Sequence, residues 1–192
     1  MFSRSYDVNG VNKIEFRPYM VECAHRYFLI ALNERNGVIK KAVSALVIEI
    51  LLKSFNAIVK ENEGEVNESY EFNGSLLKGK SAHNLINLAS ILPPEVKAYL
   101  FSHEDMRVLK RDKNSFTSDR YIYEPCASKK LDFDLFNMAR DVLCKVVYLY
   151  GQQGCQDKYI AWLNESDLYS KLLDDTTLKI YECAHGKGCL EN

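Results

Sequence analysis

Apolar residues recur every three to four positions along four stretches of the chain, which is the spacing of one buried face of an α-helix. The first stretch begins at Pro18, a residue tolerated at the first position of a helix, and ends near Gly37. The other three cover residues 38–60, 81–92 and 131–150. This pattern predicts a mostly all-α protein with more than about half of its residues in helices.

The stretch over residues 38–60 is apolar on almost every side. Its polar residues recur at steps of three to five and are Ser44, Glu49, Lys53, Asn56 and Lys60. Such a pattern predicts a helix at the centre of a bundle, with one narrow stripe facing water. Glu49 and Lys53 are also four positions apart, in the order that favours an ion pair along a helix.

The intervening segments carry weaker signals. Residues 61–78 are acidic and have no period, which indicates a surface loop. Ser81 is a suitable N-cap for the helix that follows, and Pro93-Pro94 ends that helix. Near the two ends of the chain, residues 13–16 and 176–182 alternate as strands do, so we expect a small terminal β-hairpin.

Length and composition indicate a single domain over residues 1–192, with a core over 17–150 and a C-terminal appendage over 151–192. The hydrophobic fraction of 47% and the charged fraction of 27% are those of an ordinary globular protein. The 25 basic and 26 acidic residues leave a net charge of -1. This balance excludes attraction to nucleic acid by the charge of the whole chain and leaves a local basic patch open.

Neither a membrane segment nor a disulfide framework is indicated. The longest apolar run, residues 42–52, contains Ser44 and Glu49, and it is shorter than the ~20 residues that span a bilayer. The six cysteines are irregularly spaced, and the N-terminus lacks the apolar core of a signal peptide. We therefore expect reduced thiols in a cytoplasmic protein.

Two motifs follow one another between the long helical stretches, Ser81-Ala-His83-Asn84-Leu85-Ile-Asn-Leu88 and Phe116-x3-Arg120-Tyr121-Ile-Tyr123-Glu124. In this order the sequence resembles the HEPN family of prokaryotic helical domains over residues 17–150. Some members carry a His-Asp-Leu-x2-Leu helix before an Arg-Tyr-x-Tyr-Glu segment, and Asn84 stands where those members often have Asp. The resemblance implies an antiparallel four- to five-helix bundle, often dimeric, in toxin–antitoxin, phage-defence and other RNA-targeting systems.

The sequence departs from the ribonucleases of that family at one motif. Those enzymes carry an Arg followed four to six residues later by a His, at the start of the last core helix. Here Arg120 is followed by no His before position 185, and Arg140 is equally unaccompanied. The departure argues against ribonuclease activity.

The candidate catalytic residues are His83, Arg120 and Glu124. An imidazole, a guanidinium and a carboxylate held together can position a phosphate and move a proton. The same groups can instead tie the loop before the last long helix to the 81–92 helix, with Arg120 and Glu124 as an ion pair. We favour the structural interpretation. The candidate binding residues are Asn84, Tyr121 and Tyr123.

Three possible metal ligands lie near the C-terminus, Cys183, His185 and Cys189. Zinc takes four ligands, and this spacing matches zinc sites poorly. The nine glycines are scattered and form no phosphate-binding loop. We therefore expect neither a metal nor a cofactor.

These features favour a HEPN-like module of a prokaryotic stress or phage-defence system that dimerises and binds an RNA or protein partner without catalysis of its own. The alternative is a divergent, metal-independent endoribonuclease that uses Arg120 and His83. The broad apolar surface of the 38–60 and 131–150 helices supports a homodimer, since one bundle covers only part of it.

Overall fold

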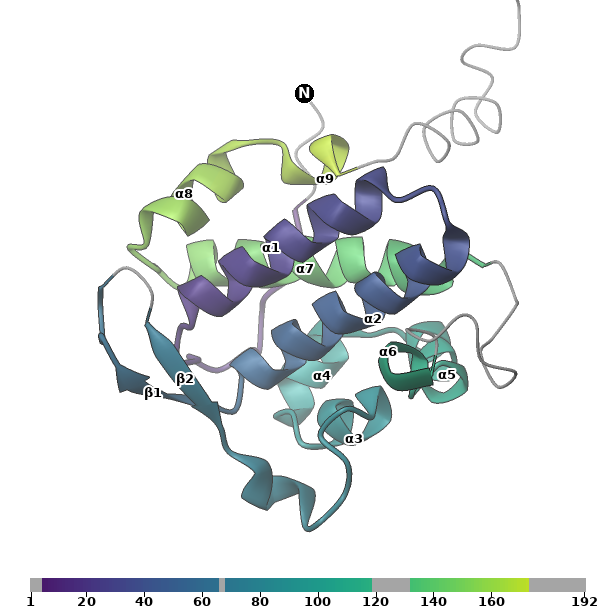
Figure 1. The fold of residues 1–192 in the computed structure, drawn as a ribbon. Coiled ribbons are helices and arrows are strands. Elements are labelled where there is room, and N and C mark those ends of the chain that lie inside the picture. Colours follow the sequence, from purple (N-terminus) through teal and green to yellow (C-terminus); the bar gives the residue numbers. More distant parts are fainter. Residues whose placement is uncertain (1–4, 66–67, 119–131, 173–192) are drawn as a thin grey trace, which may run out of the picture.

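The structure is a computed structural model, and it describes residues 5–65, 68–118 and 132–172. Helix accounts for 62% of these residues, and one small two-stranded hairpin is the strand content among them (Figure 1). The prediction of a mostly helical protein is therefore confirmed.

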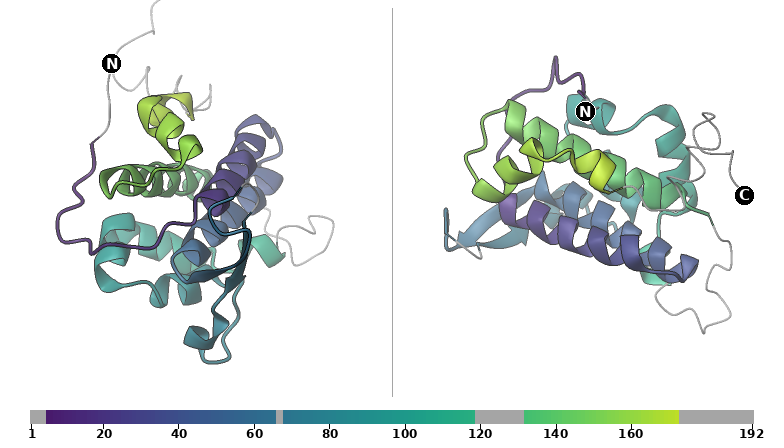
Figure 2. Two further views of the ribbon diagram at one scale, coloured as in Figure 1. Left: turned by 90° about the vertical axis from the view of Figure 1, so that its left-hand side faces the viewer. Right: turned by 90° about the horizontal axis from the view of Figure 1, so that it is seen from above.

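Three long helices form the centre of the molecule: α1 (Pro18–Asn33), α2 (Gly37–Ser54) and α7 (Asp134–Gln152). A tight connection makes α1 and α2 an antiparallel pair, in which the Asn36 side chain accepts hydrogen bonds from the first N–H groups of α2 (Figures 1 and 2). Helices α2 and α7 run in the same direction. Lys41 near the start of α2 pairs with Asp132 just before α7, and the two helices run side by side from there (Figures 1 and 2).

Helix α2 contacts α1, α7, α3 and α6, so its predicted central position is confirmed. The prediction that its polar stripe faces water was wrong, because Ser44 and Glu49 are both buried. The Ser44 hydroxyl donates to the Lys40 carbonyl at 2.7 Å, which satisfies it within the helix. The predicted Glu49–Lys53 ion pair is present, with 2.7 Å between Oε1 and Nζ.

Short helices replace the fourth long helix that a regular bundle would have, and they cover α2 and α7 (Figure 1). They are η1 (Gly74–Leu77), a 3₁₀ helix, α3 (Leu85–Ser90), α4 (Pro94–Leu100), α5 (His103–Arg111), α6 (Ser115–Ser118), α8 (Lys158–Glu165) and α9 (Leu168–Lys171). The expected cap at Ser81 was wrong, because α3 begins four residues later and Asn84 caps it. Helix α4 begins at Pro94, a residue tolerated at the first position of a helix.

The hairpin lies inside the chain and not at its termini. Strands β1 (Ala57–Glu61) and β2 (Ser69–Phe72) pair antiparallel. The helix expected to reach residue 60 therefore ends at Ser54, since the β-branched residues Ile58 and Val59 suit a strand. The expected strand at 13–16 was wrong, because that segment has no regular structure. Its proposed partner, 176–182, lies outside the described residues.

Arg17 joins three elements where α1 begins. Its buried guanidinium donates from Nε to the carbonyl of Ala57 at 2.8 Å, which fixes the start of β1. Its backbone N–H donates to the Tyr150 hydroxyl at 3.1 Å. Tyr150 is fully buried near the end of α7, and burial raises its pKa to about 12.

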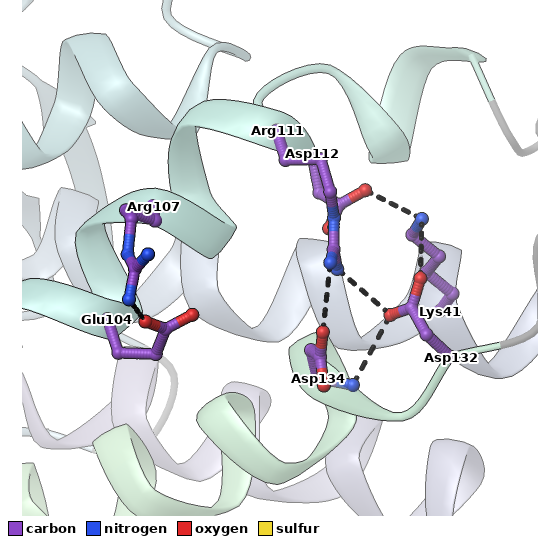
Figure 3. Close-up of polar contacts among 7 residues, drawn as sticks. All are labelled: Lys41, Glu104, Arg107, Arg111, Asp112, Asp132 and Asp134. Atoms are coloured by element: carbon purple, nitrogen blue, oxygen red, sulfur yellow. Dashed lines mark hydrogen bonds and ion pairs between the residues drawn. The ribbon is translucent and has the colours of Figure 1, made fainter.

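An ion-pair network built around the buried Lys41–Asp112 pair connects the elements at the other end of the molecule (Figure 3). The Lys41 side chain is only 3% exposed, and its Nζ lies 2.7 Å from Asp112 Oδ1 and 3.6 Å from Asp132 Oδ2. Arg111 at the end of α5 is the second cation, 3.1 Å from Asp132 and 3.0 Å from Asp134. Hydrogen bonds that Arg111 donates to the carboxylates of Asp112 and Asp134 raise its pKa above the usual range. The network connects α2, the end of α5 and the start of α7.

We predict that Lys41→Met lowers the free energy of unfolding by about 3 kcal/mol, because it leaves the buried Asp112 carboxylate with Arg111 alone. Chemical denaturation measures this change. Arg107→Met is the matched control, since Arg107 pairs with Glu104 at the surface and its loss should cost below about 1 kcal/mol. Equal effects of the two substitutions would contradict the prediction.

Candidate functional site

His83, the candidate catalytic residue that the structure describes, lies in the loop before α3. Its Nδ1 is 2.9 Å from Glu49 Oε1 on α2. The His83 side chain is 54% exposed, whereas the Glu49 side chain is 4% exposed. The same Glu49 oxygen accepts a hydrogen bond from Lys53, and the Phe116 ring lies 6.4 Å from the imidazole. The cluster therefore places an accessible imidazole on a buried carboxylate.

This arrangement suits acid–base chemistry, and it also has a purely structural explanation. A carboxylate that binds Nδ1 orients the imidazole and leaves Nε2 for an external proton donor or acceptor. The same contact ties the loop before α3 to α2, as a purely structural link would. Glu49 Oε2 is buried and has no hydrogen-bond partner among the residues that the structure describes.

Asn84, a candidate binding residue, has its side chain engaged within the protein. Its Oδ1 accepts from the backbone N–H groups of Ile86 at 3.1 Å and Asn87 at 3.2 Å, which caps α3. Its Nδ2 donates to Asn114 Oδ1 at 3.1 Å. These contacts account for Asn84 as a helix cap that also holds the loop after α5.

The remaining candidates of the central motif, Arg120, Tyr121, Tyr123 and Glu124, lie outside the described residues, as do Cys183, His185 and Cys189. Across residues 5–65, 68–118 and 132–172, no group of three His, Cys, Asp or Glu side chains is arranged to hold a metal ion. Cys23, Cys144 and Cys155 are not joined by disulfide bonds. Of the helices described, none is long and apolar enough to cross a membrane.

A cleft of about 970 Å³, which the sequence did not predict, opens between the start of α1, the β1–β2 loop and the start of α8. Its aromatic lining consists of Phe16, Tyr19, Tyr159 and Trp162. Its acidic lining consists of Glu22, Glu63, Glu65, Glu68 and Asp157. Three segments far apart in the sequence supply these side chains, so no local sequence motif predicts the cleft.

His25 joins α1 to α8 behind the aromatic side of this cleft. Its Nδ1 lies 2.8 Å from the Tyr159 hydroxyl, and its ring meets Trp162 edge to face at 6.4 Å between centroids. The His25 side chain is buried, and burial lowers its pKa below the ordinary value of 6.5. The residue therefore stays neutral in the folded protein at neutral pH.

Comparisons with models of known protein families, with curated proteins and with solved structures find no match to this chain.

We predict that the folded protein loses stability as the pH falls through and below about 6.5, because the unfolded chain then protonates His25 more readily than the folded protein does. In His25→Gln this contribution disappears, so the free energy of unfolding of the variant falls less between pH 7 and pH 5. Denaturant titrations at several pH values measure it. His103→Gln is the control, since His103 is exposed on α5. An identical pH dependence in wild type and His25→Gln would contradict the prediction.

Proposed function

We propose that this protein is a non-catalytic helical binding module that works as a homodimer, with the outer face of α1 as the contact between copies. The observation that carries the proposal is the apolar character of that face. Tyr27, Leu29 and Ile30 are all exposed, Ile30 by 55%, although the opposite face of α1 is fully buried against the rest of the protein. Around the helix Ile30 lies between Tyr27 and Leu29, so the three apolar side chains spread across the outward side of α1. Exposed apolar surface of this kind is typical of an interaction surface.

A second copy of the chain suits this face by charge as well as by hydrophobicity. Glu22 and Arg26 form an ion pair one helical turn apart on the same side of α1. In a two-fold contact between antiparallel α1 helices, Arg26 of one copy faces Glu22 of the other, and the reverse. Each charge then has two partners of opposite sign, and the apolar side chains beside them become buried.

The homodimer was expected from the broad apolar surface of the 38–60 and 131–150 helices, and the exposed face of α1 is now its basis. The apolar surfaces of α2 and α7 are covered within the chain by α1, α3, α6 and α8, so neither long helix offers a broad free face. The antiparallel α1–α2 pair and the central α2 support the proposal of a HEPN-like module in a prokaryotic stress or phage-defence system. On this proposal the dimer binds an RNA or protein partner.

We predict that the wild-type protein sediments at twice the 22.1 kDa of one chain at tens of micromolar, and that Ile30→Glu sediments as a monomer. A carboxylate at this position cannot be buried in an apolar contact without a large cost. Leu76→Glu is the control, since Leu76 is exposed on η1 at a distant surface. A wild-type protein that remains at 22.1 kDa would refute the homodimer.

One observation favours a second candidate function, an endoribonuclease that uses His83 together with Arg120. The buried Glu49 carboxylate orients the exposed His83 imidazole, as a carboxylate orients a catalytic histidine in general acid–base catalysis. Against it stand the absence from the sequence of the Arg-x4–6-His motif and the Lys53 contact, which already occupies the same Glu49 oxygen.

On our proposal the wild-type protein does not cleave single-stranded RNA in the presence of a metal chelator. If cleavage occurs, His83→Gln should reduce its rate by about 10² or more when His83 is the acid or base. His103→Gln should leave the rate unchanged. Cleavage lost in His83→Gln and kept in His103→Gln would establish the enzyme and overturn the non-catalytic module.

A further inference from the structure

We propose that the cleft between α1, the β1–β2 loop and α8 binds a linear organic cation of the polyamine class. Glu22 belongs both to this cleft and to the proposed contact between copies, whereas the other lining residues come from the β1–β2 loop, the start of α1 and α8. The proposal does not depend on dimerisation. The cleft has a volume of about 970 Å³, which lies at the upper end of the range for small-molecule sites and accommodates an extended ligand.

The charge of the cleft is strongly negative. Five of its lining side chains are acidic and one, Lys158, is basic, which leaves a formal charge of 1 − 5 = −4. Arg26 beside the cleft offsets part of this through its ion pair with Glu22. The negative charge of the cleft lining is larger than the net charge of the whole chain, which is -1. Such a concave surface attracts cations.

The acidic residues of the β1–β2 loop have different roles, because one stabilises the loop and two are exposed. Glu68 accepts hydrogen bonds from the Gly64 N–H at 2.7 Å and from the Tyr70 hydroxyl, so its carboxylate holds the shape of the loop. Glu63 and Glu65 have exposed side chains at the rim. These two carboxylates are available to a ligand. On the helical side Asp157 caps α8 through its Oδ1.

Four aromatic side chains line the cleft. The polar end of Tyr159 is used within the protein, since its hydroxyl lies 2.8 Å from His25 Nδ1. Trp162 is 52% exposed, and its ring already attracts the ammonium group of Lys171 at 5.8 Å. An ammonium or alkyl segment that lies over such rings is stabilised by cation–π and apolar contacts.

The combination of carboxylates and aromatic rings distinguishes a polyamine from other cations. A divalent metal ion requires several oxygen ligands converging on one point, and no such group of three exists in the described part of the chain. Here the carboxylates come from three segments, α1, the β1–β2 loop and the residue before α8, and aromatic side chains line the same cleft. A chain of ammonium groups separated by methylene segments offers charge to such carboxylates and apolar surface to such rings.

Isothermal titration calorimetry with spermine tests the proposal on the full chain at low and at physiological ionic strength. We expect saturable binding that weakens with salt. Trp162→Ala should weaken it by about threefold to thirtyfold, and Glu63→Gln combined with Glu65→Gln should weaken it further and reduce its salt dependence. Glu71→Gln is the control, since Glu71 is an exposed carboxylate of β2 outside the cleft and pairs with Lys60.

Magnesium chloride and a lysine-rich peptide are titrated beside spermine, and each outcome decides the proposal. Binding of spermine that needs Trp162 and exceeds that of magnesium at equal ionic strength supports it. No spermine binding, an equal loss in Glu71→Gln, or displacement of spermine by magnesium at equal charge would overturn it. Tighter binding of the peptide than of spermine, with the same dependence on Trp162, would also overturn it and identify a basic protein segment as the occupant.

Discussion

Helix α2 carries the charged groups of Lys41 and Glu49 into the interior, and the partners of these two groups arrange the elements around it. A buried ammonium group without a counter-ion is strongly unfavourable, so Lys41 requires the carboxylates of Asp112 and Asp132 at its side. Those two residues end α5 and precede α7. Farther along α2, Glu49 takes His83 and Lys53 as partners. The central helix thereby sets where three other segments meet it.

The long helices could be predicted from their apolar periodicity, because that signal is local and extends over several turns. The end of α2 could not be predicted from this periodicity. Ile58 and Val59 continue the apolar run past Ser54, and only their pairing with β2 reveals a strand. The polar stripe was misread for a related reason. Sequence spacing shows that Ser44 and Glu49 share a side of the helix, but the polar groups supplied by other segments decide whether that side meets water or protein.

The candidate site, too, could be predicted only in part from the sequence. His83 was chosen from its motif, and the structure adds the buried carboxylate that holds it, a residue already identified through its pairing with Lys53. Asn84 was chosen from the same motif and is accounted for as a helix cap. The acidic cleft could not be found from the sequence, because Glu22, Glu63 and Asp157 come from three distant segments. The one available signal was the acidic run after β1, which looked like an ordinary solvated loop.

The junction of α5 with α7 has a consequence for charged partners (Figure 3). Aligned peptide dipoles leave partial positive charge where a helix begins and partial negative charge where it ends. Arg111 closes the negative end of α5, while Asp132 and Asp134 occupy the positive end of α7. The chain's own carboxylates thus fill the place where a long helix would otherwise welcome a phosphate. A phosphate could occupy the start of α7 only by displacing Asp132 and Asp134 from their ion pairs with Lys41 and Arg111.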